Sequence, residues 1–261
     1  MHRQFAKPEQ VAAERLPLPR DAARHFVTVL RLEAGDDVEL FDGRGGCATF
    51  RLAADGEPAP ARILLREGRL VLQRVGDVRN EPRRSTQLVL CPCVSKGKRM
   101  DWTVEKAVEL GATRILPVAS DNSVVRFAGD SDREEHRSRW ERIAIDAARQ
   151  CGTSHLPEIS PPAPLDAVLA AAAHDGAALF AGGLVPDAIP FRDALSARRP
   201  LPPPSSAVWL VGPEGDFSPR EYDLLRAAGV SLVSLGQLVL RTETAAIFGL
   251  CVLATEWPSA T

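Results

Sequence analysis

The stretch LVLRTETAAIFGLCVLA, residues 238–254, places four polar residues between two apolar segments. Arg241, Thr242, Glu243 and Thr244 separate a strand-like run from a final helix that is apolar on nearly every side. A guanidinium, a carboxylate and two hydroxyls can bind charged groups and exchange protons. This polar segment is therefore the first candidate for chemistry in the chain.

Two glycine-bearing loops frame that segment. GPEGDF at 212–217 follows the apolar run 208–211, and Gly236 follows the strand-like run 231–235. In open α/β sheets, ligands bind beyond the carboxyl ends of the strands. Glycine at such a position lets backbone N–H and C=O groups approach a ligand closely. We therefore expect these two loops to form a ligand site.

The surrounding elements alternate between strand and helix. A capping box at Ser218 and Glu221 predicts the start of a helix that Gly229 ends. Other helices are expected at 100–110, 138–150 and 166–174, and strands at 88–94, 114–119, 177–182, 208–211 and 231–235. Strands separated by helices predict a mostly parallel sheet that is covered on both faces.

The amino-terminal part of the chain has a different pattern. Residues 24–75 consist of short alternating runs around an Asp42-Gly43 turn, which predicts a small all-β unit. The polar segment 77–87 is expected to be a linker.

Composition limits the possible classes. The chain has 261 residues, 45% hydrophobic content and a formal net charge of −2, as in an ordinary globular protein. It contains no apolar run long enough to span a membrane, and its first residues lack the apolar stretch of a signal peptide, so we expect a cytoplasmic location and no membrane partner. Five scattered cysteines are expected to be reduced, mostly buried thiols.

Common catalytic motifs are absent. The sequence has no GxGxxG after a strand, no GxxxxGK[ST], no GxSxG and no HExxH. His25 and His155 are the only histidines near loops of interest. The usual dinucleotide and phosphate loops are therefore excluded, and we predict no bound metal.

Basic residues are concentrated in one region. Three of the four lysines, Lys96, Lys98 and Lys106, fall within eleven residues. This cluster is either an ordinary solvated face or a surface that contacts phosphates, which requires local rather than overall positive charge.

Four segments together resemble the RsmE family of bacterial 16S ribosomal RNA uridine-N3 methyltransferases, in the SPOUT superfamily. They are SKGKRMDWTVEKAVELGATRILPVASDNSVV, RWERIAIDAARQCG, LVGPEGDFSPREYDLLRAAG and SLGQLVLRTETAA. The resemblance implies a PUA-like β-barrel RNA-binding domain at 1–76. It also implies a SPOUT α/β methyltransferase domain at 77–261, with a mostly parallel sheet and a trefoil knot near the carboxyl terminus.

The resemblance further implies S-adenosylmethionine as cofactor, 16S ribosomal RNA or the small ribosomal subunit as partner, and a homodimer through the carboxyl-terminal domain. The final helix is apolar all round, so either a second subunit covers part of it or it is completely buried in one monomer. The cofactor would be bound largely through backbone groups of Gly212, Leu235, Gly236 and Leu240. The full set of implied cofactor residues is Leu210, Gly212, Pro213, Gly215, Leu235, Gly236, Leu240, Thr242, Thr244 and Ala245.

The implied reaction requires uridine N3 to lose a proton and accept a methyl group, so the site must stabilise an anion or remove the proton. We hypothesise that Arg241 stabilises charge on the uracil carbonyls and that Glu214 or Glu243 orients a partner or takes the proton. Either glutamate could instead cap a helix or bind loop amides. Phosphate contacts are expected from Arg24, Arg31, Lys96, Lys98, Arg99 and Arg126.

The sequence departs from the family pattern at a few positions. Asp216 stands where the family usually has glycine, and the LGPR step of the family continues here as Gly236, Gln237, Leu238. Thr153 and His155 replace expected arginines. These differences affect RNA recognition more than the fold. Alternative functions are SPOUT methylation of another RNA or position, or a noncatalytic RNA-binding ribosome-assembly factor.

Overall fold

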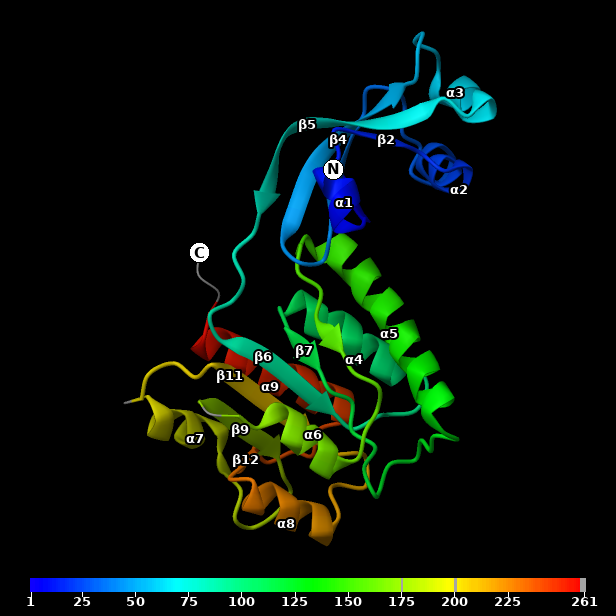
Figure 1. Cartoon of the computed structure of the whole chain (residues 1–261). Helices are drawn as coiled ribbons and strands as arrows, with labels where there is room; N and C mark the ends of the chain where they lie inside the picture. Colours follow the sequence, from blue (N-terminus) through cyan, green and yellow to red (C-terminus); the bar gives the residue numbers. More distant parts are fainter. Residues whose placement is uncertain (175, 200, 259–261) are drawn as a thin grey trace. The chain divides into compact units, whose positions relative to one another are not determined.

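The structure is a computed structural model that describes residues 1–174, 176–199 and 201–258. The chain divides into two compact units (Figure 1). The first comprises Met1–Arg83 and Ala148–His155, and the second comprises Arg84–Ala147 and the chain from Leu156 onward. In the described residues, no helix combines the length and the apolar character needed to cross a membrane.

A five-stranded sheet forms the centre of the first unit. Its order is β1-β3-β4-β5-β2, in which β1 and β3 are parallel and the other pairs are antiparallel. The strands are β1 (His2–Phe5), β2 (Arg15–Pro17), β3 (Asp37–Phe41), β4 (Gly46–Ala54) and β5 (Leu70–Asn80). The predicted turn between β3 and β4 is confirmed: Gly43 has a φ of 75°, and Asp42 Oδ1 accepts bonds from the N–H groups of Arg44 and Gly46.

The all-β expectation for residues 24–75 is wrong in part. This unit also contains α1 (Pro8–Ala12), α2 (Arg20–Arg24), the π-helical turn η1 (His25–Val29) and α3 (Ala61–Glu67). In α3, Pro60 occupies the N-cap, and Gly68 ends the helix with a φ of 70°. Ala61 and Leu64, three residues apart, are buried against the sheet. Strand β5 also extends to Asn80, through the first part of the expected linker.

A seven-stranded sheet organises the second unit, and its neighbouring strands pair in parallel in the order β10-β12-β9-β11-β6-β7-β8. The mostly parallel sheet predicted from the sequence is confirmed. The strands are β6 (Gln87–Pro92), β7 (Arg114–Ile115), β8 (Glu158–Ile159), β9 (Ala177–Gly182), β10 (Ile189–Pro190), β11 (Ser206–Val211) and β12 (Ser231–Ser234).

Six helices of this part of the chain are described: α4 (Lys98–Glu109), α5 (Asp130–Cys151), α6 (Leu165–Ala172), α7 (Phe191–Arg198), α8 (Pro219–Ala227) and α9 (Thr242–Glu256). The capping box of α8 is confirmed, since Ser218 Oγ accepts the N–H of Glu221 at 3.2 Å and Glu221 Oε2 accepts the N–H of Ser218 at 2.9 Å. Helix α5 begins eight residues before its predicted start at 138.

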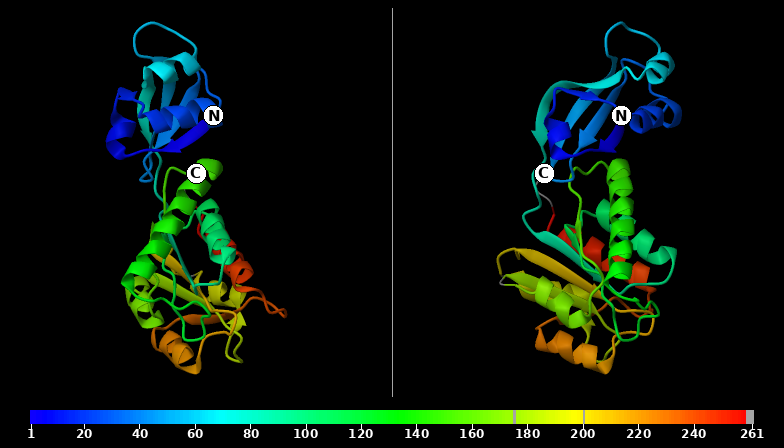
Figure 2. Two further views of the ribbon diagram at one scale, coloured as in Figure 1. Left: turned by 90° about the vertical axis from the view of Figure 1, so that its right-hand side faces the viewer. Right: turned by 45° about the vertical axis from the view of Figure 1, so that its right-hand side comes forward.

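Side chains of the central strands alternate between two helical layers. Val208 and Leu210 of β11 pack with α6 and α8 in one cluster. Trp209 points to the other face, where its Nε1 donates to the carbonyl of Ala245 in α9 at 3.1 Å. Figure 2 shows α9 beside α4 on that face, away from α8. The sheet is therefore covered on both sides, as a period of two residues per strand requires.

The five cysteines are free thiols. Cys47, Cys91 and Cys93 are buried, Cys251 is partly buried and Cys151 is exposed. Burial raises the pKa of Cys91 to about 12, so this thiol is neutral and unreactive in the folded chain.

Candidate cofactor and active site

A cavity of about 310 Å³ opens at the carboxyl ends of β9, β11 and β12. Residues from three loops line it, within 182–184, 211–216 and 233–245. The three strands are parallel neighbours in one sheet, so their carboxyl ends lie at the same edge. The two glycine-bearing loops predicted from the sequence thus meet around one cavity of a size suited to a small-molecule ligand.

Most of the predicted cofactor residues are in the cavity wall. Those that line it are Gly212, Pro213, Leu235, Gly236, Leu240, Thr242 and Ala245. The other three have different surroundings. Leu210 is fully buried in the cluster formed with α6 and α8, a Cβ on Gly215 would lie 3.4 Å from the side chain of Asn122, and Thr244 is exposed in the first turn of α9.

The sequence analysis missed a third loop. Gly182, the last residue of β9, and the following Gly183 and Leu184 form part of the wall. The signal was present in the sequence, because AALFAGG is an apolar strand that ends in glycine, and the other two strands are also followed by a glycine, Gly212 or Gly236. Its position beside β11 and β12 depends on strand order, which local patterns do not give.

The apolar run before Arg241 is not a strand. Leu238 and Val239 lie in an irregular loop with 80% and 75% of their surface exposed, and both border the cavity. Thr242, Glu243 and Thr244 form the first turn of α9. The polar segment is therefore a helix start at the edge of a cavity whose rim is apolar.

Arg99, at the start of α4, connects two candidate catalytic carboxylates. Its Nη1 donates to Glu214 Oε1 at 2.8 Å, and its Nε lies 4.0 Å from Glu243 Oε1. Glu214 and Arg241 line the cavity, whereas Glu243 is outside its wall. Glu243 Oε2 is buried without a hydrogen-bond partner. The structure thus brings Arg241 and Glu214 to one cavity and ties both glutamates to Arg99.

Asp216 adds a further carboxylate to the wall. Tyr222 Oη donates to it, at 2.9 Å from Oδ1 and 2.8 Å from Oδ2, and the N–H of Leu184 donates to the same hydroxyl at 3.2 Å. Burial is the largest cause that raises the pKa of Tyr222, and the hydrogen bond to Asp216 raises it further. The hydroxyl of Tyr222 therefore remains a donor at neutral pH. Tyr222 therefore joins two of the three cavity loops.

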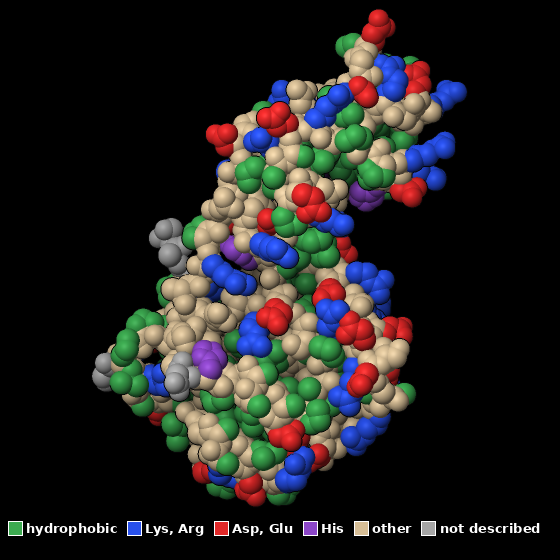
Figure 3. Space-filling model, viewed as in Figure 1, with side chains coloured by type: hydrophobic (Ala, Val, Ile, Leu, Met, Phe, Trp, Pro, Cys, Tyr) green, Lys and Arg blue, Asp and Glu red, His purple; other side chains and the backbone are tan. Residues whose placement is uncertain are grey.

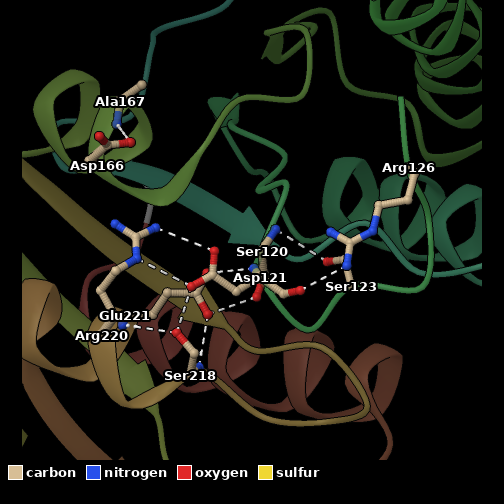
Figure 4. A network of polar contacts seen from close by, with 9 residues as sticks. All are labelled: Ser120, Asp121, Ser123, Arg126, Asp166, Ala167, Ser218, Arg220 and Glu221. Atoms are coloured by element: carbon tan, nitrogen blue, oxygen red, sulfur yellow. Dashed lines mark hydrogen bonds and ion pairs between the residues drawn. The ribbon is translucent and has the colours of Figure 1, made fainter. Parts of the chain in front are cut away.

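A polar network holds the amino-terminal end of α8 in place (Figure 4). Glu221 is 1% exposed and accepts hydrogen bonds from Ser120 Oγ at 3.0 Å and from the backbone N–H groups of Asp121 and Ser218 at 3.1 and 2.9 Å. Three donors compensate the burial of this carboxylate. Glu221 thereby ties the segment 120–126 to the helix that follows the 212–217 loop.

The same segment supports that loop directly. Asn122 Nδ2 donates to the carbonyl oxygens of Gly215 and Asp216 at 3.3 and 3.0 Å. Arg126, predicted to contact RNA, is exposed and donates to the carbonyl of Asp121 at 3.0 Å. A candidate RNA-binding side chain and the cavity loop therefore share one supporting segment.

The remaining candidate RNA contacts are on the surface. Lys96 and Lys98 are exposed on either side of Gly97, the N-cap of α4. Arg24 and Arg31 are exposed in the first unit, and Arg31 has a positive φ of 56°. On the face shown in Figure 3, basic and acidic side chains are intermixed. Along α5, for example, Arg137 forms ion pairs with Glu134 and Glu141. That surface is an ordinary solvated face.

The described residues contain no group of three or more His, Cys, Asp or Glu side chains that could hold a metal ion. The cavity lining combines glycine backbone, apolar side chains and a few charged groups, which is typical of an organic cofactor site.

Two family models match successive parts of this sequence. A model described as an RNA methyltransferase domain matches residues 82–254, and an RNA methyltransferase PUA domain matches residues 18–59. The first alone covers more than half of the chain. The chain therefore belongs to the RsmE family of RNA methyltransferases, as the motifs predicted.

Individual relatives agree with this assignment. Ribosomal RNA small subunit methyltransferase E of Mesomycoplasma hyopneumoniae is 30% identical over 65% of this chain and 69% of the relative. The Bacillus subtilis protein of the same name is 24% identical over 98% of this chain and 97% of the relative. The crystal structure of the Neisseria gonorrhoeae enzyme of that name, bound to S-adenosyl methionine, matches with a TM-score of 0.79 at 28% identity over 98% of each chain. The predicted SPOUT α/β fold with a PUA-like domain is confirmed; the trefoil knot stays a prediction.

Proposed function

We propose that this protein is an S-adenosylmethionine-dependent methyltransferase that methylates N3 of a uridine in 16S ribosomal RNA of the small subunit. The main support is the three-loop cavity at the carboxyl ends of β9, β11 and β12 in a chain of the RsmE family. The named small-subunit relatives support ribosomal RNA as the substrate. Because the substrate is a ribosomal RNA, we place the reaction in the cytoplasm.

The cavity fits this cofactor. Leu235, Leu240 and Ala245 offer apolar surface for an adenine ring, and the glycines expose backbone N–H and C=O groups for its polar edge. Asp216 offers a carboxylate to a positive charge. Of the ten residues named from the sequence, we propose the seven that line the cavity, together with the 182–184 loop, as the cofactor-binding set. When bound, S-adenosylmethionine supplies an electrophilic methyl group.

Arg241 is proposed as the catalytic cation. It lines the cavity as the N-cap residue of α9, is exposed, and its side chain makes no cap bond to the helix. Its guanidinium can therefore donate to the uracil carbonyls, which gain negative charge as N3 loses its proton. A donor at that position would stabilise the uridine anion when it attacks the methyl group.

Glu214 and Glu243 are proposed to handle the N3 proton. Glu214 lines the cavity but accepts a bond from Arg99, whereas Glu243 has a buried oxygen without a partner. Glu214 is therefore placed to take the proton, whereas Glu243, outside the wall, is placed to orient Arg99. Glutamine variants test the two residues: substitution of the residue that takes the proton should lower kcat far more than substitution of the residue that only orients a partner.

RNA binding is assigned to two surfaces. We propose that Lys96, Lys98 and Arg126 contact phosphates near the cavity, with Arg99 in a supporting position. Arg24 and Arg31 are the proposed contacts in the PUA-like domain. We propose that this domain comprises residues 1–76 and that the methyltransferase domain comprises residues 77–261. Such contacts position the RNA while the target base is splayed out for the reaction.

We also propose a homodimer through the carboxyl-terminal domain. Trp102 of α4 and Phe248 of α9 are 42% and 44% exposed on neighbouring helices. Together with Leu238 and Val239 they form apolar surface that a second copy would cover. Burial of this surface would stabilise the dimer by about 25 cal/mol per Å². Phe248→Glu should convert the dimer to monomers in sedimentation analysis, and a monomeric wild-type chain would contradict this proposal.

The decisive experiment is nucleoside mapping. Purified protein is incubated with S-adenosylmethionine and small subunits from a strain that lacks the activity, and methylated nucleosides are located by mass spectrometry. The expected product is N3-methyluridine at one position of 16S ribosomal RNA. A ribose-methylated product or methylation of another RNA would indicate a different SPOUT activity, and no product despite cofactor binding would indicate an assembly factor.

A further inference from the structure

Asp216 is an anion in the cavity wall without a cationic partner. Its Oδ1 accepts the N–H of Phe217 at 2.9 Å, and the carboxylate also accepts the hydroxyl of Tyr222. Within the described residues, no basic side chain forms an ion pair with it. Glu214, the other carboxylate of the wall, differs because Arg99 compensates its charge. A carboxylate has about four acceptor positions, so Asp216 keeps acceptor capacity for a ligand.

The position of Asp216 is fixed by its backbone and by Tyr222. Its φ of 60° is in the left-handed region, which aspartate tolerates better than most residues. Tyr222 is 5% exposed, and its hydroxyl is held by the N–H of Leu184 from the opposite loop. The carboxylate is therefore held at a defined place between two cavity loops, and it does not need to reorganise when a ligand arrives.

We propose that Asp216 recognises a positive charge of the methyl donor through its carboxylate; this inference rests on the proposed function. S-adenosylmethionine carries two such charges, on its sulfonium and on its α-ammonium group. Attraction to the sulfonium would favour the donor over S-adenosylhomocysteine, the neutral thioether left after transfer, and would help product release. Attraction to the ammonium would strengthen the binding of both compounds.

The test is calorimetric titration of the full chain with three ligands. S-adenosylmethionine carries both charges, S-adenosylhomocysteine only the ammonium, and 5′-methylthioadenosine neither. Asp216→Asn is the informative variant, because asparagine keeps the shape and tolerates the left-handed backbone. Asp223→Asn is the matched control, since it removes a charge from α8, the helix that follows the 212–217 loop, at a side chain that is 82% exposed and outside the cavity wall.

We expect Asp216→Asn to weaken S-adenosylmethionine binding about tenfold, as for a lost bond to a charged group, and Asp223→Asn to have no effect. Unchanged S-adenosylhomocysteine affinity would assign the sulfonium, and equal loss for both compounds would assign the ammonium. The proposal is overturned if Asp216→Asn binds all three ligands like wild type, or weakens 5′-methylthioadenosine as much as the donor. If the wild-type chain binds no S-adenosylmethionine, the proposed function itself fails.

Discussion

The guanidinium of Arg99 forms an ion pair with Glu214, with 2.8 Å between Nη1 and Oε1, across 115 positions of the sequence. This contact gives Arg99 a partner within its own unit. In the described chain, the neighbouring Lys96 and Lys98 are exposed and have no carboxylate partner. These three neighbouring residues therefore have different roles. Arg99 holds a cavity loop, whereas Lys96 and Lys98 are available to RNA.

The lysines should determine the salt dependence of RNA binding. Replacing Lys96 and Lys98 together by alanine removes two phosphate contacts, each contributing about 0.7 to 0.9 to the slope of log affinity against log salt. Arg99→Ala should change the slope less, because Glu214 already compensates its charge. Fluorescence anisotropy with a ribosomal RNA fragment over a range of salt concentrations measures both. An unchanged slope in the double variant would make these lysines a solvated surface only.

Arg241 should act on the reaction and not on cofactor binding. Arg241→Ala removes one donor to the developing negative charge, and loss of such a donor typically lowers kcat by a factor of about 10² to 10³. The S-adenosylmethionine affinity should stay at the wild-type value, because the wall is otherwise intact. Arg220→Ala is a suitable control, since Arg220 pairs with Asp121 outside the cavity. Normal turnover in Arg241→Ala would remove this residue from the mechanism.

Glu221 should stabilise the fold and the cavity loop together. Glu221→Gln replaces an acceptor oxygen by an NH₂ group among three donors, so at least one buried N–H or O–H loses its partner, at about 1 to 3 kcal/mol. Urea unfolding measures the loss, and a weaker S-adenosylmethionine affinity should accompany it. Glu135→Gln, at an exposed position of α5, should stay within about 0.5 kcal/mol of wild type. Equal stability of the two variants would contradict the role assigned to the network.

Gly249 should be required by packing despite its low helix propensity. Alanine in a helix interior gains about 1 kcal/mol over glycine, but a Cβ at position 249 would lie 2.1 Å from Trp209 Cε2. Overpacking of this kind costs about 1 to 3 kcal/mol, so Gly249→Ala should be destabilised in thermal unfolding. Trp209→Phe should make the alanine less costly in a double-mutant cycle. A more stable Gly249→Ala variant would show that the helix can shift away from β11.

Features set by neighbouring residues were predicted well from the sequence. The Ser218 and Glu221 capping box, the Asp42-Gly43 turn and the strands β9, β11 and β12 are each encoded within a few positions. Seven predicted cofactor residues line the cavity because they sit on the loops that follow two of these strands.

Features that depend on distant partners were not predicted. The exposed loop at Leu238 and Val239 has the composition of a strand, but within the described residues it pairs with no strand of either sheet. The 182–184 loop joins the cavity through strand order, and Arg99 meets Glu214 only after the sheet has formed. Helices α2 and α3 were missed since they are only one to two turns long and give little periodicity.

The cavity that the 182–184, 211–216 and 233–245 loops enclose is the centre of this account, and direct titration tests it. Wild-type protein should bind one S-adenosylmethionine per chain in calorimetry. Ala245→Phe, which fills the wall at the start of α9, should abolish that binding, whereas Ala254→Phe on the same helix outside the wall should not. No heat with the wild-type chain, or undiminished binding by Ala245→Phe, would contradict the assignment of this cavity to the methyl donor.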